Sequence, residues 1–163
     1  MGKIISFANQ KGGVGKTTTC INLAAYVAAM GKKVLVVDLD SQGNATSGLG
    51  IEKTKELKTI YDLISGDTKM EEVIKPTLLE NLDIIPSTVD LAGAEIEMVQ
   101  MPQREKIIKG ILELIKDSYD FIMIDCPPSL GLITVNGLTA SDSVIIPIQC
   151  EFFPLEGLTQ LMN

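Results

Sequence analysis

The chain has 163 residues, of which 45% are hydrophobic and 21% charged, a balance that fits one globular domain and excludes a disordered chain. Its formal net charge of −7 excludes a general electrostatic match of this chain to nucleic acid. No apolar run reaches the ~18 residues of a membrane-spanning helix, and the N-terminus does not resemble a signal peptide. The three cysteines are odd in number and lack a C-x-x-C spacing, which argues against disulfides or a zinc site and indicates a reducing cytoplasm.

Short runs rich in Val and Ile alternate along the chain with helical patterns. Strands are expected at 3–8, 33–40, 81–87, 119–125 and 143–149. Helices are expected at about 16–30, 58–65, 88–99, 103–117 and 131–140, with another beginning near Pro154. Strands without polar alternation are typical of a sheet buried on both faces. The sequence therefore predicts one α/β domain over 1–163, with a mostly parallel sheet flanked by helices.

The first expected strand runs into the glycine-rich stretch QKGGVGKTT and then into a helix. This arrangement is typical of a phosphate loop, because glycines let backbone N–H groups converge on an anion at the positive end of a helix. The general pattern G-x-x-x-x-G-K-[ST] places Lys16 along the β- and γ-phosphates of a nucleotide and the Thr17 hydroxyl on Mg²⁺. Its first glycine is replaced by Gln10, and the pattern gives no role to the second lysine, Lys11.

The second strand, VLVVDLD, ends in two carboxylates, Asp38 and Asp40. Alternate residues of a strand share a face, so both are expected at the carboxyl end of the sheet, where one orders an attacking water and the other supports the metal shell. The alternative is that one of them caps a turn or forms a salt bridge. The polar stretch 41–59 is too long for a tight connection, so we expect a functional or mobile loop there.

A third carboxylate, Asp125, ends the apolar strand FIMID. In open α/β sheets ligands bind outside the carboxyl ends of the strands, so Asp125 is expected in the same crevice as the phosphate loop. A carboxylate that acts on Mg²⁺ through water is the second half of a P-loop NTPase site. Considered alone, a strand-terminal Asp is more often a turn or helix cap.

The last expected helix begins at Pro154 and stops after a few turns. Its apolar residues Leu155, Leu158, Leu161 and Met162 need a packing partner, which indicates that the chain is cut from a longer protein. The alternative is a naturally short final helix.

Four motifs, KGGVGKTTT, VVDLDSQGNAT, IDCPPSLG and VIIPIQCEFFPLEG, occur in this order and together resemble the ParA/Soj chromosome and plasmid partition ATPases over essentially the whole chain. The resemblance implies an ATPase with a deviant Walker A loop in which Lys11 is the signature lysine. In such proteins two ATP-bound subunits face each other, and each signature lysine reaches the phosphates of its partner's nucleotide. A cation supplied in this way links ATP binding to homodimer formation.

The same resemblance assigns the site residues. It implies catalytic roles for Lys11, Lys16 and Asp40, with Asp40 positioning the hydrolytic water, and Mg²⁺ binding by Thr17 and Asp125 with support from Asp38. The residues expected to contact ATP are Lys11, Gly12, Gly13, Val14, Gly15, Lys16, Thr17 and Thr18. Expected partners are a ParB-like centromere-binding protein and nonspecific DNA, bound by the full-length protein in a salt-dependent way in the nucleoid. The adenine contacts and the basic DNA-binding surface are expected beyond residue 163.

Other classes with related loops stay open. A MinD-like membrane-associated cell-division regulator has a different loop from SQGNAT, and a bacterial tyrosine kinase needs a tyrosine cluster at its tail, whereas this chain holds only Tyr26, Tyr61 and Tyr119. A nitrogenase iron protein needs paired cysteines, and a structural role suits Cys126 better. A ligase of the dethiobiotin synthetase kind needs a charged small-molecule pocket, which the sequence does not identify.

Overall fold

The structure is a computed structural model that describes residues 2–150 and 161–162. Its strands are β1 (Lys3–Phe7), β2 (Val34–Asp38), β3 (Lys75–Pro76), β4 (Leu82–Ile85), β5 (Phe121–Asp125) and β6 (Ser143–Ile145). Its α-helices are α1 (Lys16–Ala29), α2 (Asn44–Gly48), α3 (Ile60–Ser65), α4 (Met70–Val73), α5 (Leu91–Met98), α6 (Ile107–Glu113) and α7 (Leu132–Ala140). Two short 3₁₀ turns, η1 (Arg104–Lys106) and η2 (Lys116–Ser118), flank α6.

The six strands form one sheet in the order β3-β4-β2-β5-β1-β6. All neighbouring pairs are parallel except the edge strand β3 with β4, which are antiparallel and joined by residues 77–81. The central strand β5 lies between β1 and β2, so that Asp125 stands in register with Phe7 on one side and Asp38 on the other. The ends of the three strands that lead into the expected site motifs therefore meet at one edge of the sheet.

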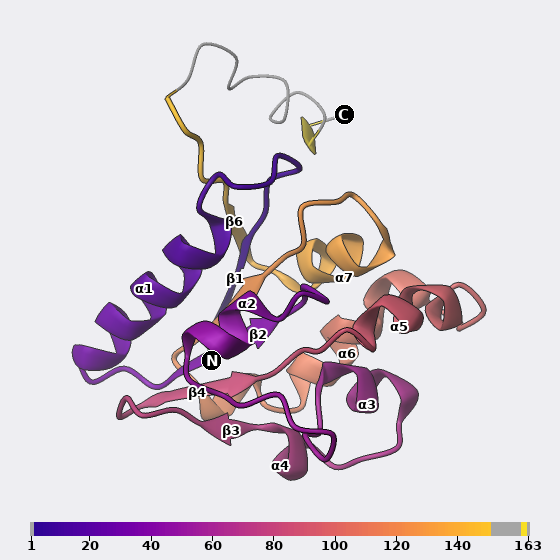
Figure 1. Cartoon of the computed structure of the whole chain (residues 1–163), viewed down its shortest axis with the longest axis horizontal. Helices are drawn as coiled ribbons and strands as arrows, with labels where there is room; N and C mark the ends of the chain where they lie inside the picture. Colours follow the sequence, from indigo (N-terminus) through magenta and orange to yellow (C-terminus); the bar gives the residue numbers. More distant parts are fainter. Residues whose placement is uncertain (1, 151–160, 163) are drawn as a thin grey trace.

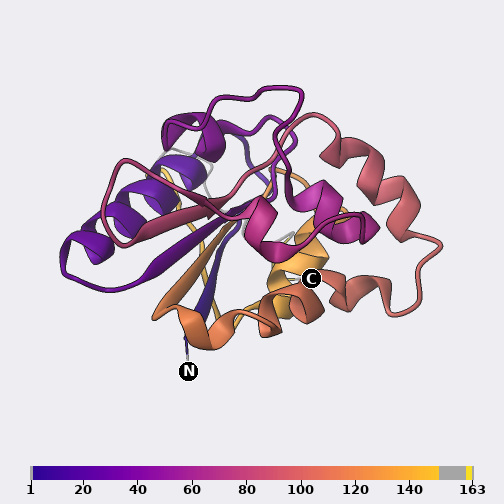
Figure 2. The same ribbon diagram turned by 90° about the horizontal axis from the view of Figure 1, so that it is seen from below.

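Helices cover both faces of the sheet, as Figures 1 and 2 show. Because side chains alternate along a strand, Val34 and Val36 of β2 pack toward α1 and α2, whereas Leu35 and Val37 pack toward α3, α5, α6 and α7. Two buried cores result, one on each face, and all five residues of β2 are buried. The predicted three-layer α/β arrangement is confirmed.

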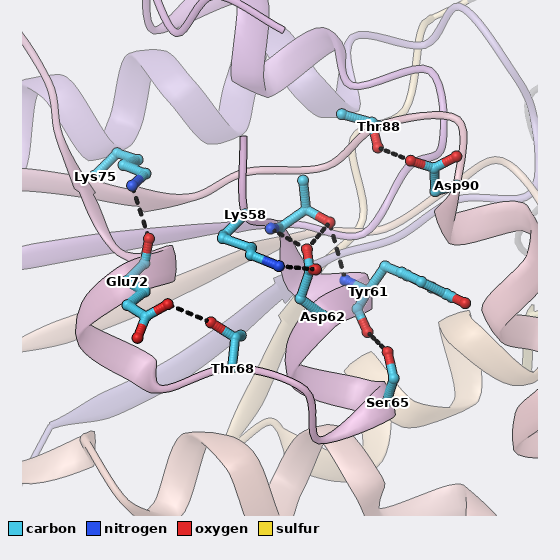
Figure 3. Close-up of polar contacts among 10 residues, drawn as sticks. Lys58, Tyr61, Asp62, Ser65, Thr68, Glu72, Lys75, Thr88 and Asp90 are labelled. Atoms are coloured by element: carbon cyan, nitrogen blue, oxygen red, sulfur yellow. Dashed lines mark hydrogen bonds and ion pairs between the residues drawn. The ribbon is translucent and has the colours of Figure 1, made fainter. Parts of the chain in front are cut away.

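The region between β2 and β4 contains more regular structure than its polar sequence indicates. We expected 41–59 to be a functional or mobile loop, but it contains α2, whose Ala45 and Thr46 are fully buried. At the start of α3, Thr59 and Asp62 form a capping box, and Figure 3 shows Lys58 extending to the same Asp62 carboxylate, 3.1 Å away. Buried side chains and caps hold the backbone at these residues, and the expected functional or mobile character of the stretch stays a prediction.

Most other expected elements lie where the sequence placed them, with shifted ends. The expected helix at 103–117 is shorter, because α6 spans only its middle and 3₁₀ turns replace both ends. The helices α2 and α4 and the strand β3 were not predicted, since none exceeds five residues. The expected helix start at Pro154, with Leu155 and Leu158, lies outside the described residues. Within them, no helix is long and apolar enough to cross a membrane.

Candidate functional site

The phosphate loop connects β1 to α1 and leaves the first turn of α1 open. Gly13 and Gly15 have φ angles of 71° and 87°, in the left-handed region that glycine adopts without strain. Gly15 is the N-cap of α1, and it brings no side chain that could cap the free N–H groups. These groups are therefore available to an anion at the positive end of the helix dipole.

Lys16 is the first residue of α1 and is buried, with 7% of its surface exposed. Its Nζ donates to the backbone oxygen of Lys11 at 3.1 Å, so the ammonium spans the loop. Burial lowers the pKa of Lys16, although the nearby carboxylates of Asp125 and Asp40 act in the opposite direction. A buried ammonium that lies among backbone N–H groups is suited to contact phosphate oxygens.

Thr17 and Asp125 form the contact that joins the phosphate loop to the end of β5. The Thr17 hydroxyl donates to Oδ2 of Asp125 at 2.7 Å. The carboxylate is fully buried, and its other oxygen, Oδ1, has no hydrogen-bond partner among the described residues. Burial raises the pKa of Asp125 to about 7, with the Thr17 hydrogen bond acting against the shift.

The two aspartates after β2 have different surroundings. Asp38 is fully buried, and its oxygens accept hydrogen bonds from the backbone of Asp40 at 3.0 Å and from the backbone and hydroxyl of Thr46 at 2.9 and 2.7 Å. Burial raises the pKa of Asp38, and these hydrogen bonds oppose the shift. Asp38 thus anchors α2 to β2. The metal role predicted for it stays a prediction, and its contacts favour a structural role.

Asp40 lies beyond the end of β2 and faces an open cavity of about 380 Å³. We expected both Asp38 and Asp40 at the ligand crevice, but only Asp40 lines the cavity. One of its oxygens accepts from the backbone N–H of Gln42 at 2.9 Å, which begins the turn leading to α2. The cavity is lined by Gly12, Gly13, Gly15, Lys16, Thr17, Thr18, Asp40, Gln42, Asn44 and Pro128.

This lining contains six of the eight residues predicted to contact ATP. The other two do not line it: Val14 is buried, and Lys11 is exposed. The lining also contains Gln42, Asn44 and Pro128, to which the sequence reasoning gave no role. A signal was present, because all three belong to the motifs that follow β2 and β5.

Residues after β6 also hold the phosphate loop. Gln149 donates through Nε2 to the backbone oxygen of Gly13 at 3.0 Å. Asn9 donates to the backbone oxygen of Pro147 at 2.9 Å and accepts from the backbone N–H of Lys11 at 3.0 Å. The loop is thus fixed from the side of β6 as well as from β5, a contact that spacing along the chain does not indicate.

The residues around Asp125 fit a magnesium ion. Oδ1 of Asp125, without a partner among the described residues, and the adjacent Thr17 hydroxyl are oxygen ligands of the kind that Mg²⁺ prefers, and Thr17 lines the open cavity. Among the described residues, no three Asp, Glu, His or Cys side chains are grouped as a metal-binding cluster. This also suits Mg²⁺, which is commonly held by one or two protein ligands together with water and substrate phosphates.

Comparisons with known proteins agree on one family. A family model described as an AAA domain matches residues 2–163. The Soj sporulation initiation inhibitor of Bacillus subtilis is 61% identical over all of the chain and 64% of its own length, and the Treponema pallidum chromosome-partitioning ATPase Soj is 54% identical over 63% of its length. A cobyrinic acid a,c-diamide synthase structure from Mycobacterium smegmatis, with bound ATP analogue and magnesium, has a TM-score of 0.94 and 39% identity; the match covers 99% of this chain and 66% of that one. The chain thus spans just under two thirds of the length of these proteins.

Proposed function

Because this chain belongs to the AAA domain family, and within it to the Soj/ParA partition ATPases, we propose that it binds ATP with Mg²⁺, hydrolyses it to ADP and phosphate, and forms a homodimer when ATP is bound. The observation that carries the proposal is the meeting of the open N-terminus of α1, Lys16, Thr17 and Asp40 in one cavity with Asp125 behind it. ATP-analogue and magnesium binding by the structural relative supports the choice of ligand.

Phosphate binding within one subunit is assigned to the loop from Gly12 to Thr18, and Lys11 contacts the nucleotide of the partner as described below. The glycine N–H groups and the Lys16 ammonium neutralise the β- and γ-phosphates, and Thr17 and Asp125 hold Mg²⁺. Bound Mg²⁺ supplies charge neutralisation at the phosphates. Occupation of this site gives the unpaired Oδ1 of Asp125 a partner and favours its ionised form, against the effect of burial.

Hydrolysis is assigned to Asp40, which faces the cavity from the turn after β2. Its carboxylate accepts a hydrogen bond from the attacking water and orients that water toward the γ-phosphate. The water oxygen forms a bond to phosphorus as the bond to the β-γ bridging oxygen breaks, which leaves ADP and inorganic phosphate. In phosphoryl transfer most catalysis comes from such positioning and from charge stabilisation.

Dimer formation is assigned to Lys11. It is exposed next to the cavity without lining it, so its own subunit's nucleotide is not its obvious target. In a face-to-face dimer, Lys11 of each subunit contacts the phosphates bound by the other. ATP then stabilises the dimer and the dimer completes the catalytic site, which is a reciprocal linkage.

Segregation of chromosomes or plasmids is the proposed cellular role. The full-length protein binds DNA nonspecifically through phosphate contacts, and a ParB-like centromere-binding protein stimulates its hydrolysis. It works in the cytoplasm, at the nucleoid and not at a membrane. The Treponema relative, named as a chromosome-partitioning ATPase, supports this role.

The test is sedimentation of the full-length protein with and without Mg²⁺-ATP, together with calorimetric titration of ATP. The wild type should bind ATP and become a dimer. Lys11→Ala should bind ATP as a monomer, and Lys16→Ala should lose ATP binding, because each charge-assisted hydrogen bond contributes about 1.5–3 kcal/mol. Normal ATP-dependent dimers of Lys11→Ala would refute the role of that lysine, and unchanged ATP affinity of Lys16→Ala would refute the phosphate site.

The name of the structural relative favours one alternative, an ATP-dependent small-molecule synthase. The two functions differ in the reactants that they need besides ATP. A partition ATPase releases phosphate from ATP with water as the only other reactant, whereas a synthase requires a carboxylic acid and an amine donor. Phosphate release by the purified protein in buffer, increased by DNA, would favour partition.

A further inference from the structure

Two loops of the nucleotide site present alternate residues to opposite sides. Asp40 and Pro128 line the nucleotide cavity. Their chain neighbours line a second cavity of about 130 Å³ directly behind those loops; these neighbours are Leu39, Ser41, Pro127 and Ser129. We call this second cavity the rear cavity. Contacts made across it therefore affect the position of the two loops that line the nucleotide site.

Glu95 of α5 is the one ionisable residue among the described residues that line the rear cavity. Its Oε1 accepts a long hydrogen bond, 3.4 Å, from the backbone N–H of Ile133 in the first turn of α7. The first turn of α7 contains no acidic residue of its own. A carboxylate at that position is stabilised by the helix dipole.

Gly131, the N-cap of α7, leaves the space that Glu95 occupies. A Cβ at Gly131 would lie 2.0 Å from Oε1 of Glu95 and 3.0 Å from its Cδ. The backbone of Gly131, with φ −71° and ψ −179°, is accessible to any residue. Glycine is required here for room and not for its conformational freedom, so a larger residue would displace the carboxylate without straining the backbone.

A hydrogen bond joins the loop to the first turn of α7. Thr134, fully buried in the first turn of α7, donates its hydroxyl to the backbone oxygen of Ser129 at 2.7 Å. The position of the α7 N-terminus is thereby linked to Ser129 and to its neighbour Pro128, which lines the nucleotide cavity.

We propose that Glu95 is a positioning residue of the nucleotide site, which holds the N-terminus of α7 and, through it, the 127–131 loop against the nucleotide cavity. The proposal rests on the ATPase function proposed above. Glu95 does not line the nucleotide cavity and acts only through the loop. Because the phosphate contacts come from 11–18, loss of Glu95 should reduce the rate of hydrolysis and leave the binding of Mg²⁺-ATP intact.

The test compares Glu95→Ala, Gly131→Ala and the double variant in the full-length protein. The first deletes the carboxylate and the second displaces it, so each should lower kcat about two- to five-fold while KM for Mg²⁺-ATP stays within about twofold. The double variant should be no slower than the slower single variant, since both remove the same contact. Glu95→Gln keeps an acceptor without the charge and should have an intermediate kcat. Gly93→Ala is the matched control on α5, where a Cβ meets no atom within 4 Å.

A ligand-free readout separates this proposal from the ATPase function. Amide hydrogen exchange at Ile133 and Ser129 should be faster in Glu95→Ala and Gly131→Ala than in the wild type and in Gly93→Ala. Unchanged exchange, or fully multiplicative losses of kcat in the double variant, would overturn the positioning role. If the wild type hydrolyses no ATP but exchange responds as expected, the proposed function fails and the contact between Glu95 and the loop stands.

Discussion

Replacing Asp125 by Asn should make the ligand-free protein more stable than the wild type at neutral pH. At acidic pH the difference in stability between the two proteins should be small. Asp125 is fully buried, its Oδ1 has no hydrogen-bond partner within residues 2–150 and 161–162, and burial raises its pKa from 3.8 to about 7. The folded state therefore holds the proton more tightly than the unfolded state does. This contribution to stability is complete below about pH 4 and is lost as the pH rises to about 7.

The size of the effect follows from linkage at about 1.4 kcal/mol per pH unit. Between pH 5 and pH 7 the wild type should lose about 2 kcal/mol through Asp125, because the folded carboxyl is half ionised at pH 7, whereas Asn does not titrate. The measurement is urea unfolding of both proteins from pH 5 to pH 8 in EDTA and without nucleotide. The stability advantage of the variant should increase over this range and then level off.

A matched control has the opposite sign. The backbone N–H of Ile4 donates to Asp142 at 2.8 Å and lowers the pKa of that carboxyl, so Asp142→Asn should destabilise the protein at neutral pH and lose this effect as the pH falls below about 4. A pH-independent difference between wild type and Asp125→Asn would refute the assignment of the raised pKa to burial. In the presence of ATP, the same variant should also lose the Mg²⁺ dependence of nucleotide affinity.

Asp40→Ala should retain ATP and Mg²⁺ binding but lose turnover, giving a dimer locked with ATP in single-turnover and sedimentation assays; equal loss of affinity and rate would place Asp40 among the binding groups instead. Thr46→Val should lower the free energy of unfolding by about 2–4 kcal/mol in urea titrations, because the buried Thr46 hydroxyl both donates to Asp38 and accepts from the backbone N–H of Ser87, and an undiminished stability would contradict this. Gly137→Ala should cost about 1–3 kcal/mol in the same assay, since its Cβ would lie 2.9 Å from Sγ of Cys126; a neutral result would mean that α7 shifts freely.

The sequence was most informative where local chemistry and chain direction decide the structure. Glycines before Lys16 predict the phosphate loop, and apolar runs ending in Asp38 and Asp125 predict parallel strands whose carboxyl ends converge. The structure confirms those strands. They could be predicted because a sheet buried on both faces requires a continuous apolar pattern that few other structures use.

What the sequence did not reveal depends on contacts between distant segments. Nothing in the DLD pattern shows that Thr46 would satisfy Asp38 and leave only Asp40 at the cavity. The contact between Gln149 and the phosphate loop joins positions 136 residues apart. Such partners are chosen by tertiary packing, which strand and helix patterns do not encode.

The order of strands in the sheet has a consequence for synthesis of the protein. Among the described strands β1 is made before the others, yet it lies between β5 and β6, and the backbone N–H of Ile4 donates to Asp142 across 138 residues of chain. At about 5–20 residues per second, the ribosome needs at least ~6 seconds to add the residues that reach β5. During that time the apolar strand KIISF has no neighbour on either side. Of the six described strands, the one that carries the phosphate loop is thus made before the others and is among the last to be enclosed, which leaves it open to chaperones and to pairing with other nascent chains.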